Sequence, residues 1–325
     1  MIPLAVLNPA GADPDQDFSG GPGDPSDRGH PPINYHAYAA CCGGVFVRAV
    51  PSIPVRCPAV LVLLRPRHLA RAARAAKEAR AMGLRVFVSW KESGLAQVCA
   101  ALSSAGRWQE FRNIARVADG FLSSTGDLAP VYAGAGFARG GFVPTPYPLE
   151  FPAWDFSRPD GEGVFVGTRE FDVPVRAHAA ALAALAPLAA AGTRVTAVVT
   201  GGRADAALAR MICPGISLVP GPLPYGEYLR LMASHAVVFQ ADRSSVPGQV
   251  AGDALLAGVP CIGGDGAIDR FAFGECGPLD ASIEHVRRFL ADAAARREFF
   301  AESRERAMGV LSFGAGARRI AEIFG

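Results

Sequence analysis

Short apolar runs alternate with longer segments of helical periodicity along this chain, and that alternation constrains its fold more than any other feature. In the first half, the apolar run Ala59–Leu64 precedes a helical pattern over His68–Met82, and Arg85–Ser89 is the next apolar run. A strand, a crossover helix and a second strand form the repeating unit of a parallel sheet. The sequence therefore predicts an α/β fold with parallel sheets.

The same alternation begins again after a proline-rich stretch. Val164–Val166 is the next predicted strand, and a helix is predicted over Val173–Ala190. From Ser282 to its end the chain is predicted to be helical. We therefore expect a Rossmann-like domain at 1–148, a hinge at 149–162, a second Rossmann-like domain at 163–311, and a final helix at 312–325 that could cross back to the first domain. Two such domains facing each other would leave a ligand cleft at the carboxyl ends of their strands. The prolines of this stretch are Pro144, Pro146, Pro148, Pro152 and Pro159.

The composition excludes several classes of protein. Of the 325 residues 50% are hydrophobic and 19% charged, which suits two packed cores. A formal net charge of +2 argues against a nucleic-acid partner. The seven cysteines show no C-x-x-C pair, which argues against a zinc site. The opening residues lack the positive charge with which a signal peptide begins. The most apolar stretch, Ala177–Ala191, is too short to span a membrane. We expect a cytoplasmic protein without a transmembrane segment or metal site.

The segment Tyr225–Phe273 carries the most informative pattern. Gly248 stands at the start of a predicted helix, and Asp253 follows about one and a half turns later. The free amides and the positive dipole end of such a helix favour an anionic ligand, and a carboxylate at Asp253 can accept hydrogen bonds from both hydroxyls of a ribose. The alternative is that Gly248 shapes a tight turn and Asp253 is solvated.

This segment, SVPGQVAGDALLAGVPCIGG, resembles the donor-binding half of GT-B glycosyltransferases of the retaining, group 1 or family 4-like type, which carry a Glu-x7-Glu element. The resemblance places Gly248 at the second glycine of the family's donor loop, Gln249 beside it, and Asp253 at the second acid. The first acid falls on Ser245, so the pair becomes Ser-x7-Asp. In the family that Glu contacts the transferred sugar, and a serine can bond a hydroxyl without carrying the charge.

A second resemblance lies in Gly163–Arg176, GVFVGTREFDVPVR, which is similar to the family's strand and turn FVGR…KG. It implies that Arg169 and Arg176 neutralise the donor diphosphate, with Gly167 and Thr168 beside them. The planar guanidinium suits this role because it binds phosphate oxygens bidentately and stays charged. Alternatively, Arg176 is an ordinary surface charge.

The run RVFVSWKE resembles a strand of the same family that ends in a histidine at the reaction centre. Lys91 takes the place of that histidine, and Glu92 could act as a base on an acceptor hydroxyl. Farther back, His30, Asn34 and His36 gather in a glycine- and proline-rich entry loop, where such enzymes bind the acceptor. An ordinary charged turn at Lys91, and capping or packing roles for the histidines, are the alternatives.

Together these patterns predict a metal-independent and cofactor-independent hexosyltransferase. It would move a sugar from a nucleotide-diphosphate sugar to a hydroxyl of a sugar, lipid-linked sugar or protein, with retention. Arginine and helix dipole would neutralise the leaving diphosphate. The alternatives are a sugar-nucleotide epimerase on the same fold and a catalytically degenerate nucleotide-binding or interaction module.

Overall fold

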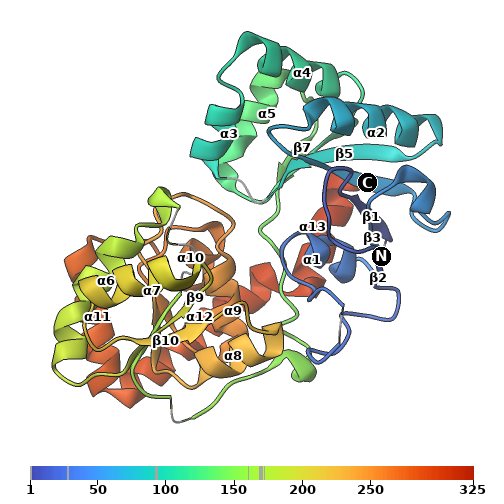
Figure 1. Cartoon of the computed structure of the whole chain (residues 1–325). Helices are drawn as coiled ribbons and strands as arrows, with labels where there is room; N and C mark the ends of the chain where they lie inside the picture. The colour runs from blue at the N-terminus through green and yellow to red at the C-terminus, as the bar shows by residue number, and fades with distance from the viewer. Residues whose placement is uncertain (1, 28, 92–93, 160, 168–170, 172) are drawn as a thin grey trace. The chain divides into compact units, whose positions relative to one another are not determined.

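The computed structural model describes every residue except 1, 28, 92–93, 160, 168–170 and 172. The chain divides into two compact units (Figure 1). Unit 1 comprises residues 1–150 and 309–325, and unit 2 comprises residues 151–308. The second boundary lies in the last turn of α12 (Ala293–Leu311), so the chain returns to unit 1 before its final helix.

The described part of unit 1 is built on a seven-stranded sheet in the order β2-β3-β1-β4-β5-β6-β7. Its strands are β1 (Leu4–Leu7), β2 (Gln16–Asp17), β3 (Val45–Val47), β4 (Ala59–Leu64), β5 (Arg85–Trp90), β6 (Gly120–Ser123) and β7 (Gly140–Phe142). The pairings are parallel except that of β2 with β3, which is antiparallel. The six residues of β4, AVLVLL, are all buried, as expected for a parallel strand covered on both faces.

Helices connect the strands of this sheet or follow them. They are α1 (Asn34–Cys41), α2 (Leu69–Ala81), α3 (Leu95–Ala101), α4 (Ala105–Ala115), α5 (Ala129–Ala135) and α13 (Phe313–Phe324). In α2 the residues Leu69, Ala72 and Ala76 are buried, and Gly83, with a φ of 82°, follows the helix end. Helix α13, red in Figure 1, packs against α1, so the end of the chain completes unit 1.

The described part of unit 2 contains a five-stranded parallel sheet in the order β10-β9-β8-β11-β12. Its strands are β8 (Val164–Val166), β9 (Val195–Val199), β10 (Ser217–Pro220), β11 (Val237–Phe239) and β12 (Cys261–Ile262). Its helices, besides α12, are α6 (His178–Ala190), α7 (Gly202–Ile212), α8 (Tyr225–Ala233), α9 (Gln249–Ala257), α10 (Ala267–Ala272) and α11 (Leu279–Ala291). Since the strands are parallel, their carboxyl ends share one edge of the sheet.

The predicted α/β class with parallel sheets is confirmed, and two local predictions were wrong. The helix predicted from Val173 begins only at His178, because Pro174–Arg176 form a 3-10 turn and Ala177 adopts a left-handed φ of 48°. Between β1 and α1 the chain also forms the short strand β2, whose backbone pairs with β3. The helical region predicted from Ser282 onward is interrupted at Asp292, and again at Ser312, where the separate final helix was predicted to begin.

Two capping side chains cause these interruptions. The carboxylate of Asp292 accepts hydrogen bonds from the amides of Ala294 and Ala295 at 2.9 and 3.0 Å. The hydroxyl of Ser312 accepts one from the amide of Ala315 at 3.2 Å. Each satisfies amides that have no partner at a helix start, so a new helix begins at each point. Among the helices of the described residues, none has the length and apolar character needed to cross a membrane.

Candidate functional site

The carboxyl ends of β8 and β11 lie side by side and bring two predicted donor-binding segments together. Gly167 follows β8, and its amide donates a hydrogen bond of 2.9 Å to the carbonyl of Phe239 at the end of β11. A Cβ atom on Gly167 would clash with Cγ1 of Val250 in α9. The glycine therefore allows the start of α9 to approach the end of β8. Thr168 and Arg169 lie outside the described residues.

Gly248 precedes α9 with a φ of 89°, a backbone conformation that favours glycine. A Cβ atom there would lie 2.8 Å from Oδ2 of Asp269 and 3.1 Å from the amide nitrogen of Ile268. Both the backbone angle and the close approach thus require glycine. Gln249, the first residue of α9, is half-buried. The amides of this first turn lack acceptors within the helix and point toward its N-terminal end.

Asp253 lies within α9 and is only 1% exposed. Its Oδ1 accepts a hydrogen bond of 2.6 Å from the phenol of Tyr225, the first residue of α8. The alternative of a solvated Asp253 does not hold, because this carboxylate is buried against a phenol. Tyr225 had not been expected at the site from the sequence.

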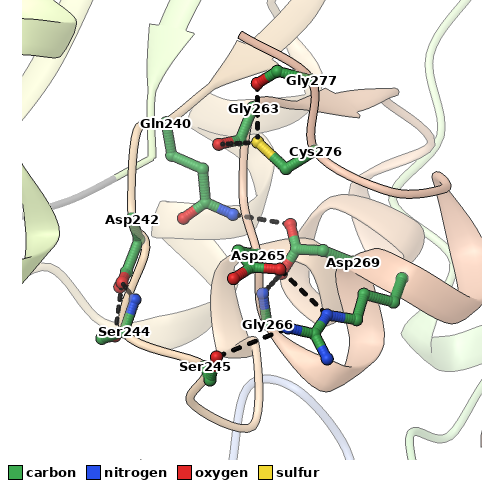
Figure 2. Close-up of polar contacts among 11 residues, drawn as sticks. Gln240, Asp242, Ser244, Ser245, Gly263, Asp265, Gly266, Asp269, Cys276 and Gly277 are labelled. Atoms are coloured by element: carbon green, nitrogen blue, oxygen red, sulfur yellow. Dashed lines mark hydrogen bonds and ion pairs between the residues drawn. The ribbon is translucent and has the colours of Figure 1, made fainter. Parts of the chain in front are cut away.

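Ser245 has a φ of 48° in the loop between β11 and α9. Its hydroxyl accepts a hydrogen bond of 3.4 Å from Nη2 of Arg270, whose Nε donates one of 2.9 Å to Oδ1 of Asp265 (Figure 2). In the same loop, the carboxylate of Asp242 accepts a hydrogen bond of 2.9 Å from the amide of Ser244. The position where the resembling family carries an acid therefore holds a neutral hydroxyl next to a guanidinium.

Arg176 lies in the short turn before α6 and is half-buried. The carbonyl of its neighbour Val175 accepts a hydrogen bond of 3.3 Å from the amide of Arg243. This bond holds the turn against the loop that follows β11. Arg176 thus belongs to a segment that contacts the same loop as Ser245.

A buried carboxyl that the sequence did not single out lies behind Gly248. Asp269 is 2% exposed, and its Oδ1 accepts a hydrogen bond of 2.8 Å from the side-chain amide of Gln240 (Figure 2). Its Oδ2 accepts one of 3.2 Å from the amide of Gly266. Burial raises the pKa of Asp269 to about 7, against the effect of the Gln240 bond. An acid three residues after a helix start was the available sequence signal.

In unit 1 the predicted residue Lys91 follows β5 and pairs with Asp13. Its Nζ lies 3.2 Å from Oδ2 of Asp13, which also accepts a hydrogen bond of 3.0 Å from the side chain of Asn8. Burial raises the pKa of Asp13, but the Lys91 ammonium outweighs it and leaves the pKa below its ordinary value. Asp13 is therefore an ionised carboxylate at neutral pH. Glu92 lies outside the described residues, and the sequence did not single out Asp13.

His36, in α1, stacks between two rings. Its centroid is 3.7 Å from that of His30 and 3.6 Å from that of Phe46. Burial, with smaller effects from His30 and Lys91, lowers the pKa of His36 to about 3, although Asp13 opposes the shift. Its Nε2 is buried without a hydrogen-bond partner among the described residues. Asn34, at the start of α1, has a φ of 50°, which asparagine tolerates.

Metal-ligating side chains do not gather in the described part of the chain: no three His, Cys, Asp or Glu residues there form a group that could hold an ion. The described free cysteines include Cys261 and Cys276, close to Asp269.

No protein-family model and no curated protein matches this chain. Solved structures do match. A trehalose-6-phosphate protein from E. coli bound with UDP-2-fluoro glucose has 11% identity and a TM-score of 0.62, with 85% of this chain and 75% of that chain covered. A UDP-forming trehalose-phosphate synthase from Burkholderia xenovorans has 11% identity and a TM-score of 0.57, with 82% and 73% covered.

TarM from S. aureus, in complex with Fondaparinux, α-GlcNAc-glycerol and UDP, has 12% identity and a TM-score of 0.57. The match covers 82% of this chain but only 55% of TarM. At such identities the likeness shows the fold alone. The chain has the GT-B fold that these glycosyltransferases share.

Proposed function

We propose that this chain is a glycosyltransferase that moves a sugar from a nucleotide-diphosphate sugar to a hydroxyl acceptor. One observation carries the proposal: Gly167, Gly248 and Asp253 gather at the carboxyl edge of the sheet in unit 2. In open α/β sheets, ligands bind outside this edge. The UDP-containing neighbours of the same fold support a nucleotide ligand.

The diphosphate is assigned to the N-terminal end of α9. The amides of its first turn and its dipole favour an anion, and Gly167 lets α9 come close to the end of β8. Arg176, in the turn that contacts the loop after β11, supplies positive charge, and Arg169 does so by the family resemblance. These cations and dipoles neutralise charge that develops on the leaving diphosphate, so no step requires a metal.

The ribose is assigned to Asp253 and Tyr225. A buried carboxylate forms strong hydrogen bonds with hydroxyl groups, and the phenol fixes its orientation at 2.6 Å. Ser245 is assigned to the transferred sugar, whose hydroxyls it can bond. We propose retention of configuration, as the resembling family implies.

The acceptor is assigned to unit 1. The ionised carboxylate of Asp13, held by Lys91 and Asn8, can accept a hydrogen bond from an acceptor hydroxyl. The neutral imidazole of His36 lies in the same group, since the charges of Asp13 and Lys91 both act on it. Glu92, His30 and Asn34 are further acceptor-side candidates.

A nucleotide-binding module without transferase activity is a second candidate, and Ser245 favours it. Its hydroxyl is bonded by Arg270 at the position where the family carries an acid. Such a module would bind a sugar nucleotide and leave it unchanged. An epimerase would instead convert the bound sugar without an acceptor.

Calorimetry with UDP-glucose, GDP-mannose and ADP-glucose, followed by product analysis with candidate acceptors, tests these assignments. We expect binding of at least one sugar nucleotide, weakened at least tenfold by Arg176→Ala. Arg71→Ala, an exposed arginine of α2 in unit 1, should leave binding unchanged. Absence of binding across the panel contradicts the proposal, and binding without turnover favours the module.

The acceptor assignment has its own test. Asp13→Asn should lower the transfer rate while donor affinity stays unchanged, because the two ligands are assigned to different units. Asp15→Asn, at an exposed carboxylate paired with Arg48, is the matched control. Equal loss of transfer in both variants would refute the role of Asp13.

A further inference from the structure

Asp269 connects three segments at the donor edge of unit 2. Its carboxyl bonds Gln240 at the end of β11 and the amide of Gly266 before α10, and it lies against Gly248 before α9. We propose that Asp269 is a positioning residue that fixes the Gly248 end of α9, and that it takes up a proton when a diphosphate binds there. This inference rests on the proposed function, because it requires a diphosphate to bind at the same donor site.

The geometry leaves this carboxyl little freedom. A Cβ atom on Gly248 would lie 2.8 Å from Oδ2 of Asp269, and one on Gly266 would lie 2.6 Å from the same oxygen. The backbones of both glycines therefore approach Asp269 so closely that a side chain on either would collide with it. A displacement of this carboxyl toward Gly248 would therefore push on the backbone that starts α9.

Burial and the like charge of Asp242 make the ionised form of Asp269 costly. Asp242, in the loop after β11, lies close enough to oppose a second negative charge. The thiols of Cys261 in β12 and Cys276 after α10 also face this carboxyl and supply no positive charge. Arg270, the next residue along α10, bonds Asp265 and Ser245. Burial, with a smaller effect from Asp242, raises the pKa of Asp269 to about 7, against the hydrogen bonds from Gln240 and Gly266.

A diphosphate at the start of α9 would add further negative charge on the other side of Gly248. A like charge nearby favours the neutral carboxyl, so the bound protein should hold this proton more tightly than the free protein. By linkage, donor binding then takes up protons and weakens as the pH rises. A cavity of about 170 Å³ beside the carboxyl, whose lining includes Asp269, Glu275, Cys276 and His285, is assigned the exchange of the proton.

The experiment is calorimetry of the full chain with UDP-glucose, GDP-mannose and ADP-glucose between pH 6.5 and 8.5. These probes are diphosphate diesters whose phosphates do not titrate in this range. Each titration is repeated in two buffers of different ionisation enthalpy, which counts the protons taken up. Asp269→Asn keeps the shape of the side chain but cannot ionise. Asp265→Asn, in the same loop, is the matched control.

For the wild type and the control we expect proton uptake on binding near pH 8 and a dissociation constant that rises about five- to tenfold over this range. Asp269→Asn should bind with no proton uptake and a flat pH profile. Binding by the wild type without proton uptake overturns this inference and leaves the proposed function intact. Failure of all three probes to bind the folded wild type overturns both.

Discussion

The phenol of Tyr225 donates a hydrogen bond of 2.6 Å to Oδ1 of Asp253 and so joins the start of α8 to the middle of α9. Asp253 is 1% exposed, and a buried carboxylate is costly without such a partner. The same bond orients the carboxylate to which we assign the donor ribose. Stability and donor binding are therefore linked through this pair.

Tyr225→Phe should lower the free energy of unfolding by about 1–3 kcal/mol, because it removes one hydrogen-bond partner of a buried carboxyl group. We also expect weaker donor binding, since the orientation of Asp253 is less well defined without the phenol. Urea denaturation and calorimetry measure the two effects. Tyr228→Phe removes another buried hydroxyl from the same helix and is the matched control. Equal stability and affinity in the two variants would disprove the coupling.

Gly248→Ala should destabilise unit 2 more than an ordinary glycine replacement. Gly192 has the same φ of 89°, but a Cβ atom there meets nothing within 4 Å, whereas one on Gly248 meets Asp269 at 2.8 Å. Gly192→Ala should therefore cost about 1–2 kcal/mol from the backbone angle alone. Gly248→Ala should cost at least about 1 kcal/mol more, from overpacking. Thermal and urea denaturation of both variants provide the comparison, and equal costs would contradict it.

Much of the fold could be predicted because apolar runs mark buried strands. The run Ala59–Leu64 coincides with β4, and Val164–Val166 with β8. The predicted helix boundaries were wrong where a single residue ends or delays a helix that the apolar periodicity alone would continue. Pro174 and the left-handed Ala177 delay the start of α6, and the Asp292 side chain ends one helix and begins another. Such events depend on single residues, so a periodicity averaged over a window does not detect them.

Stability should depend on pH through Asp269. Its pKa is raised to about 7 in the folded protein from an ordinary value of 3.8. The unfolded chain therefore releases this proton from about pH 4, while the folded chain keeps it until about pH 7. The free energy of unfolding consequently falls as the pH rises through this window, by at most about 4 kcal/mol from this group.

Asp269→Asn removes this dependence. The stability of the variant relative to the wild type should rise between pH 4 and 7 and stay constant above pH 7. The buried His36 and His235, whose pKa values are lowered to about 3 and about 4, change stability in the opposite direction but equally in both proteins. Urea denaturation at several pH values measures the difference. A difference that does not vary with pH would be inconsistent with a raised pKa.

The variant His36→Phe distinguishes a packing role of His36 from a role in sugar transfer. A phenyl ring can occupy the stack between His30 and Phe46. Because the folded protein keeps His36 neutral down to about pH 3, its contribution to stability is lost as the pH falls below about 6.5. The variant should therefore resist acid better than the wild type.

Sugar transfer, in contrast, should fall at least tenfold in His36→Phe if the imidazole contacts the acceptor, with donor affinity unchanged. His68→Phe, at an exposed histidine just before α2, is the control for both readouts. Unchanged transfer in His36→Phe would leave this residue a packing role only.

Residues of the candidate site could be predicted from the sequence only where they lie within one short segment of the chain. Gly248 and Asp253 share one helix, so their spacing is visible in the sequence. Asp13 and Lys91 lie 3.2 Å apart but 78 positions apart along the chain, and only the order of the strands in unit 1 brings them together. Asp269 likewise meets Gln240 through the pairing of β11 with β12. Such contacts depend on sheet topology, which a linear pattern does not specify.

Hydrogen exchange tests the central claim most directly, because it locates a bound nucleotide sugar on the chain. In the presence of a saturating UDP-, GDP- or ADP-sugar, we predict slower exchange of amides in residues 245–253, which include Gly248 and the first turn of α9. A nucleotide sugar that binds and leaves exchange in this segment unchanged would contradict the account.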